Sequence, residues 1–170
     1  IENSALRGEN VLALLRGANP SRPAVVLSAH YDHHGVQPPT PGYPEGRIYP
    51  GACDNASGVA VLLAVAEVLA GEARPLPRPV LFAAFGGEEL GLQGSRAFAD
   101  AFLRSPLRLL CDFNVDMAAR NDEQLMTVVG SSFAPDLAEV AFASLRDARM
   151  SPVTTLGRGP YASWPIDFTF

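Results

Sequence analysis

Three short apolar runs, each followed at once by polar side chains, limit most strongly what this chain can fold into. The runs occupy residues 24–29, 80–85 and 109–115, and each has the length and composition of a strand buried on both faces. Helix-like patterns follow at residues 59–70, 95–103 and 135–146, and two further strand patterns stand at 10–15 and 125–129. Strands that alternate with helices predict an α/β fold with a mixed, mostly parallel central sheet and helices on both faces.

Composition and charge narrow the class of protein. The chain has 170 residues, 48% apolar and 18% charged, which suits one globular domain over 1–170 with a sizeable core. A net charge of −5 argues against nucleic acid as a partner. No apolar run reaches the roughly 18 residues of a membrane span, so we expect none. The chain begins at Ile1 without a leader, and we expect it to be incomplete at both ends.

The polar residues after the apolar runs have a common position in the predicted fold. Because ligands bind beyond the carboxyl ends of strands in such sheets, side chains that follow several strands are expected to share one rim. A further aspartate, Asp54, stands in a loop of small residues just before the helix at 59–70. The set predicted to meet is His30 and Asp32, Glu88 and Glu89, Asp116, and Asp54.

This set of donors suits a divalent metal that accepts nitrogen and oxygen, such as zinc, manganese or cobalt. Two such metals need a shared carboxylate between them, and Asp54 is the natural bridge. Glu88 and Glu89 point in different directions on an extended chain, so one can bind metal while the other acts as general base. Asp32 could hold His30 by accepting its second N–H.

Each motif also has a simpler interpretation. Asp54 could be a helix cap, the Glu88–Glu89 doublet could be first-turn helix charges, and His30 could be a satisfied core histidine. His33 and His34 are expected to be solvent-facing or structural. The Pro- and Gly-rich stretch 35–50 has no pattern for a core element and is expected to form a rim over the site. If all of the simpler interpretations held, several unrelated polar residues would share the carboxyl-end rim of the sheet by coincidence.

Four segments make the chain resemble a known family, the co-catalytic zinc exopeptidases. These include bacterial leucyl and other secreted aminopeptidases, with glutamate carboxypeptidase II and the glutaminyl cyclases as distant members. The resemblance extends from about residue 10 to at least residue 130. The matching segments are HYD at 30–32, GACDNASG at 51–58, FGGEELGLQGS at 85–95 and NVDM at 114–117.

The resemblance implies a metallopeptidase-like catalytic domain with a mixed, eight-stranded type of sheet, acting on peptides and most often as an aminopeptidase. It implies that His30, Asp54 and Asp116 hold one zinc, while Asp54 and Glu89 hold a second. Glu88 would be the general base and Asp32 the carboxylate behind His30. Family habit also implies a secreted or periplasmic protein.

The chain departs from the family at its last metal ligand. The family's second zinc takes a histidine from a downstream Ser-Asp-His segment, but no histidine follows His34 here. The corresponding slot reads ASWPIDF at 162–168, with Ser163 in place. We therefore expect one well-formed zinc site and a second, looser one in a catalytic domain truncated on its C-terminal side. Two alternatives stay open: a metal-poor, inactive relative that acts as a binding module, and a one-zinc acyltransferase of the glutaminyl cyclase kind.

Overall fold

The computed structural model describes residues 7–119, 125–131 and 133–154. The chain divides into two compact units, residues 1–119 and 120–170, and each is described by itself. All the predicted site residues belong to the first unit. Residues 162–168, which correspond to the segment with the family's last histidine ligand, lie outside the described residues.

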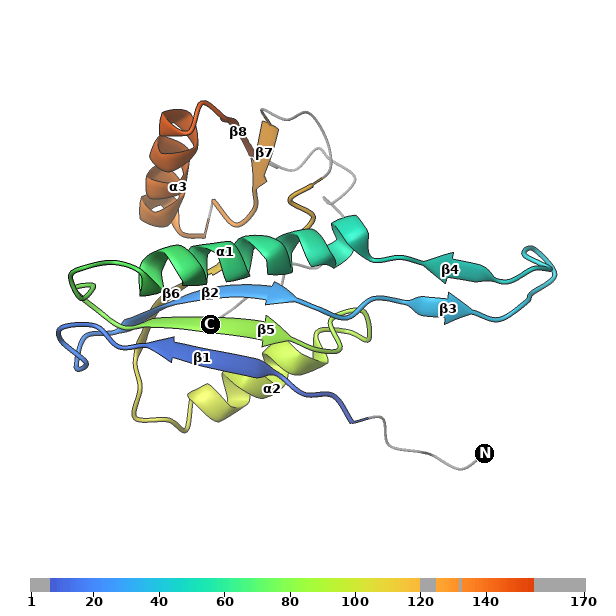
Figure 1. Cartoon of the computed structure of the whole chain (residues 1–170), viewed down its shortest axis with the longest axis horizontal. Helices are drawn as coiled ribbons and strands as arrows, with labels where there is room; N and C mark the ends of the chain where they lie inside the picture. The colour runs from blue at the N-terminus through green and yellow to red at the C-terminus, as the bar shows by residue number, and fades with distance from the viewer. Residues whose placement is uncertain (1–6, 120–124, 132, 155–170) are drawn as a thin grey trace. The chain divides into compact units, whose positions relative to one another are not determined.

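The first unit is built on a four-stranded sheet in the order β1-β5-β2-β6 (Figure 1). Strand β2 runs parallel to both β5 and β6, whereas β1 is antiparallel to β5. The predicted mixed, mostly parallel sheet is confirmed. The strands are β1 (Val11–Leu15), β2 (Ala24–His30), β5 (Val80–Phe85) and β6 (Leu109–Asn114).

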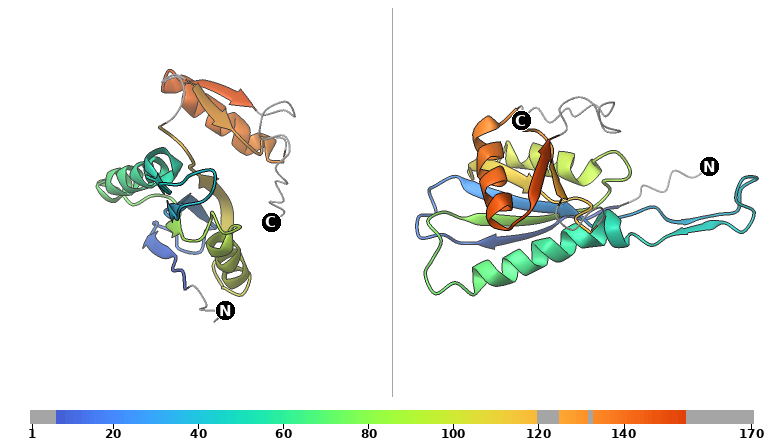
Figure 2. Two further views of the ribbon diagram at one scale, coloured as in Figure 1. Left: turned by 90° about the vertical axis from the view of Figure 1, so that its right-hand side faces the viewer. Right: turned by 90° about the horizontal axis from the view of Figure 1, so that it is seen from above.

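Helices α1 (Gly58–Ala70) and α2 (Gln93–Phe102) cover opposite faces of this sheet, as Figure 2 shows. Successive side chains of β5 alternate between the faces, as a strand requires. Val80 and Phe82 pack with Leu62 of α1, and the ring of Phe85 lies 5.4 Å from that of Phe98 in α2. Burial on both faces explains why these strands read as unbroken apolar runs.

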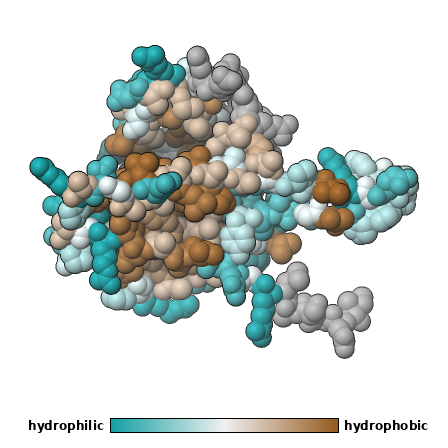
Figure 3. Space-filling model, in the orientation of Figure 1, coloured by the Kyte–Doolittle hydropathy of each residue, from teal (hydrophilic) through white to brown (hydrophobic). Residues whose placement is uncertain are grey.

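Helix α1 follows an irregular, wide turn, η1 (Ala52–Ser57), and ends at Gly71 as predicted. Together the two segments form one helical stretch, Ala52–Ala70, that is long and apolar enough by length and composition to cross a membrane. We did not expect such a stretch from the sequence, where polar residues interrupt the apolar run. In the structure, Leu62 on one face of α1 is buried against the sheet, and 17% of the apolar window is buried. Leu63 and Val68 of α1 are exposed. Figure 3 shows apolar side chains gathered on the face of the molecule where α1 lies.

The segment after β2 forms a short hairpin of β3 (Gly35–Gln37) and β4 (Arg47–Tyr49). The sequence predicted no core element here, and the hairpin adds nothing to the core, but its two short strands were not predicted. The guanidinium of Arg47 lies over the rings of Tyr43 and Tyr49, at 5.5 and 4.7 Å from their centroids. Side-chain stacking of this kind stabilises a hairpin that has few apolar residues.

The second unit contains β7 (Leu125–Val128), α3 (Pro135–Asp147) and β8 (Ser151–Thr154). Strand β7 and helix α3 lie where the sequence predicts them. Strand β8 pairs in parallel with β7 and was not predicted, because its four residues include Pro152 and are too few for a clear pattern.

Candidate metal centre

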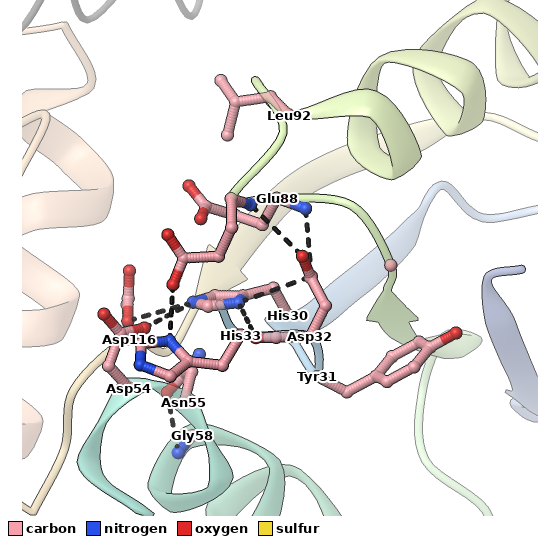
Figure 4. Close-up of polar contacts among 12 residues, drawn as sticks. His30, Tyr31, Asp32, His33, Asp54, Asn55, Gly58, Glu88, Leu92 and Asp116 are labelled. Atoms are coloured by element: carbon pink, nitrogen blue, oxygen red, sulfur yellow. Dashed lines mark hydrogen bonds and ion pairs between the residues drawn. The ribbon is translucent and has the colours of Figure 1, made fainter. Parts of the chain in front are cut away.

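Three donors from separate parts of the chain converge at the carboxyl edge of the sheet (Figure 4). His30 is the last residue of β2, Asp116 follows the end of β6, and Asp54 lies in η1. The Nε2 atom of His30 is 3.1 Å from an oxygen of Asp54 and 3.5 Å from an oxygen of Asp116. The structure thus brings together the three residues that the family resemblance assigned to one zinc.

His30 lies at the bottom of this group, with only 3% of its surface exposed. Its Nδ1 atom is 3.1 Å from the backbone carbonyl oxygen of Asp32, which accepts the Nδ1 proton and leaves Nε2 facing the two carboxylates. Burial acts to lower the pKa of His30. The hydrogen bond and charge of Asp116, followed by the charges of Glu88 and Asp54, outweigh burial and raise that pKa to about 9.

The carboxylate of Asp32 has a different partner from the one predicted. It lies 3.7 Å from Nδ1 of His30, beyond hydrogen-bond distance. Its two oxygens instead accept hydrogen bonds from the backbone N–H groups of Glu88 and Glu89, at 3.0 and 3.3 Å. Gly87 has a φ of 72°, so the chain turns here in a conformation that glycine adopts without strain. Asp32 therefore fixes the turn that carries both glutamates.

Glu88 lies beside the three donors and is partly buried. Burial raises the pKa of its carboxyl, His30 opposes this, and the nearby Glu89, Asp116 and Asp32 raise it further. A carboxylate with a raised pKa holds a proton more readily at neutral pH than an exposed glutamate does. That is the property a general base needs when it must also return the proton.

Asn55 is a site residue whose role the sequence did not reveal. Only 1% of it is exposed, and its Oδ1 atom accepts hydrogen bonds from the backbone N–H groups of Gly58 and Met117 at 3.0 and 3.1 Å. Its Nδ2 atom donates to the carbonyl oxygen of Val115 at 3.0 Å. This one amide joins the loop of Asp54 to the segment that carries Asp116. Asparagine is a residue type that caps helix N-termini, and the bond from Gly58 at the start of α1 is of that kind.

A second group of possible ligands lies next to the first and consists of His33, Asp54 and Glu89. The Nδ1 atom of His33 is 2.6 Å from one oxygen of Glu89, and Nε2 of His34 is 3.1 Å from the other. Asp54 belongs to both groups, which is the arrangement a bridging carboxylate needs. His33 and His34 were expected to be solvent-facing or structural; 19% of the His33 side chain is exposed, against 51% for His34.

The chemistry of these donors fits a divalent metal of the zinc type. Imidazole nitrogens and carboxylate oxygens are its preferred ligands when thiolates are absent, and both groups consist of these two kinds alone. Five carboxylates surround the site, so a doubly charged cation would offset their mutual repulsion. They are Asp32, Asp54, Glu88, Glu89 and Asp116.

Comparison with known proteins adds the decisive observation, because residues 10–155 match Peptidase family M28. The chain belongs to peptidase family M28. One relative is the aminopeptidase YwaD of Bacillus subtilis, 34% identical over 118 residues that cover 68% of this chain and 23% of that protein. Another, a probable zinc metalloprotease of Pyrenophora teres f. teres, is 33% identical over 65% of this chain and 23% of its own length.

Several solved structures share the fold of this chain. LapB from Legionella pneumophila has a TM-score of 0.70 and 26% identity, over 86% of this chain and 38% of that one. The zinc aminopeptidase BSAP from Bacillus subtilis has a TM-score of 0.56 and 24% identity, over 89% and 42%. The glutaminyl cyclase of Porphyromonas gingivalis has a TM-score of 0.64 and 22% identity, over 86% and 56%. The chain thus spans 23% of the length of the two curated relatives named above.

Proposed function

We propose that this M28 chain hydrolyses the peptide bond at a chain end in a metal-dependent reaction, and that it acts as an aminopeptidase. One observation carries the proposal: His30 Nε2 faces Asp54 and Asp116 at 3.1 and 3.5 Å, with Glu88 beside them. The metal proposed for this group is zinc, held by His30, Asp54 and Asp116. Glu89 would contribute to a second ion on the other side of Asp54.

Bound there, a divalent metal would polarise the scissile carbonyl and make a neighbouring water easier to deprotonate. Glu88 takes the proton of the attacking water on its carboxylate and passes it to the leaving amine. Asp32 holds Glu88 in position through the backbone N–H that it accepts. The backbone carbonyl of Asp32 keeps the His30 ring in one orientation, and Asn55 holds the two carboxylate-bearing loops together.

The peptide substrate is proposed to approach past the β3–β4 hairpin. A cavity of about 390 Å³ lies against His34, Gln37 and Tyr49, and His34 contacts Glu89 of the proposed centre. The opening therefore adjoins the reacting groups, and the hairpin forms its rim.

We also propose, from the family resemblance, that the protein is secreted or periplasmic. Fractionation of the native cells would test this location.

The activity is tested by giving the purified protein two substrates in parallel, with zinc present. The first is leucine p-nitroanilide, which reports aminopeptidase turnover, and the second is a peptide with N-terminal glutamine, which reports cyclisation. Release of nitroaniline without cyclisation supports the proposal. Cyclisation alone would instead establish the acyltransferase alternative, and zinc binding without either reaction would establish a binding module. Glu88→Gln is the control, because it should bind zinc and release no product.

A further inference from the structure

The second metal position of this chain has no nitrogen ligand assigned to it by the family resemblance. By the family resemblance Asp54 and Glu89 hold this metal, and both are carboxylates. Two carboxylates without a nitrogen donor hold zinc more loosely than a set that includes imidazole. His33 supplies an imidazole nitrogen close to both carboxylates.

His33 meets Glu89 across 56 residues of sequence, with Nδ1 2.6 Å from a carboxylate oxygen. The ligand atoms of His33, Asp54 and Glu89 all lie within 4.8 Å of one another. Imidazole nitrogen and carboxylate oxygen are both ligand atoms for a divalent cation of the zinc type. The three ligand atoms are therefore close enough together to bind one ion.

The surroundings of His33 fix its ring in this place. The ring centroid of His34 lies 5.0 Å from that of His33, and the ring of Tyr49 packs edge-on at 6.0 Å. Gly51, at the start of the loop that carries Asp54, has a φ of 71°. A Cβ atom there would lie 3.2 Å from the Cβ of His33, so this loop packs directly on the histidine. The histidine and the proposed bridging carboxylate are thus held together by backbone packing.

We propose that His33 is a nitrogen ligand of a second divalent metal ion, which it holds together with Asp54 and Glu89. This inference rests on the proposed function, since it assigns a ligand within the same centre. It gives the second position one imidazole and two carboxylates, a donor set like that of His30, Asp54 and Asp116. His34 contacts the other oxygen of Glu89, is half exposed, and belongs to neither group of possible ligands.

The main competing role for His33 is to orient Glu89 by a hydrogen bond without touching metal. Asparagine separates the two roles, because its Nδ2 atom can occupy the place of histidine Nδ1 and still donate to Glu89. A neutral amide nitrogen is a poor zinc ligand, however, so His33→Asn keeps the hydrogen bond and removes the metal donor. The matched control is His34→Asn, which changes the neighbouring histidine.

The test combines zinc stoichiometry by calorimetric titration with X-ray absorption at the zinc edge, which counts imidazole ligands. We expect two zinc ions in the wild type and in His34→Asn, with on average one imidazole per zinc. His33→Asn should lose the second zinc, with its affinity falling by more than about 100-fold, since even residues behind a ligand cost 10–100-fold. His30→Ala should keep one zinc, bound with one imidazole.

Several results would overturn the inference. Two zinc ions in His33→Asn, with affinities within about threefold of wild type, would show that His33 only orients Glu89. A single zinc in the wild type that is unchanged in His33→Asn would also reject it, while leaving the metal-dependent function intact. No zinc binding by the wild type would reject the proposed function itself. Circular dichroism of each variant confirms that a lost zinc is not a lost fold.

Discussion

Asn55 donates a hydrogen bond to the carbonyl oxygen of Val115, which is 3.0 Å away in space and 60 residues away in sequence. The bond joins the loop of Asp54 to the end of β6, and the same side chain accepts from the N–H of Met117. Two of the proposed ligands, Asp54 and Asp116, therefore keep their separation through one buried amide. The rigidity of the centre depends on a side chain that would not touch the metal.

Asn55→Asp tests this relationship. The new carboxylate cannot donate to the carbonyl of Val115 and would place two acceptors face to face in a buried position. We expect a loss of about 1–3 kcal/mol in the free energy of unfolding and weaker zinc binding. Asn19→Asp, at an exposed turn, makes the same change of charge and should leave both quantities unaltered. Urea denaturation and zinc titration measure them; equal stabilities for the two variants would contradict the assignment.

Glu88→Gln is predicted to abolish turnover while zinc binding stays nearly intact, because the amide cannot accept the proton of the attacking water. Glu89→Gln should instead weaken zinc binding, since it removes a charged oxygen ligand. The pair forms its own control, because both variants make the same substitution at adjacent positions. The measurements are the turnover of leucine p-nitroanilide and the zinc affinity of each variant. Ordinary turnover by Glu88→Gln would refute the division of roles.

Asp32→Asn is predicted to lower zinc affinity or turnover by roughly 10–100-fold. The amide keeps one acceptor, but its NH₂ group would face a backbone N–H of Glu88 or Glu89 that the carboxylate now satisfies. The loss should appear in kcat together with altered backbone amide shifts of these two glutamates. Reduced zinc affinity with both amide signals unmoved would mean that Asp32 acts through the His30 ring instead.

The raised pKa of His30 predicts how the stability of the metal-free protein changes with pH. The ordinary pKa of histidine is 6.5 and that of His30 is about 9, so the folded state binds a proton that the unfolded state releases. This contribution is fully present below pH 6.5 and is lost as pH rises to about 9. His30→Gln should flatten that slope, as measured by urea denaturation with chelator present. An unchanged slope would show that His30 is not the group responsible.

Much of the fold follows from the sequence because the buried strands have a strong pattern. Residues 80–85 were predicted to the residue, since β5 is the strand covered on both faces. The meeting of His30, Asp54 and Asp116 also followed, because parallel strands present their carboxyl ends at one edge. Strand β8 and the hairpin could not be predicted, since short, exposed strands lack a hydrophobic period.

The finer contacts of the centre could not be predicted for a different reason. Asp32 accepts a hydrogen bond either from His30 or from the backbone of Glu88, and shifts of about 0.5 Å in atomic position decide which. Strand alternation fixes only the direction in which a side chain points. His33 lies in the same motif as His30, but its contact with Glu89 depends on how the chain turns after β2. The burial of Asn55 likewise depends on packing between distant segments.

The central claim, that this M28 chain carries a metal-dependent peptidase centre, is tested most directly by removing and restoring the metal. Turnover of leucine p-nitroanilide is measured on the purified protein after treatment with a chelator and then as zinc is added back. The account predicts that turnover falls to background without metal and returns as zinc fills the site of His30, Asp54 and Asp116. Full turnover by protein shown to hold less than about one tenth of an equivalent of any transition metal would contradict it.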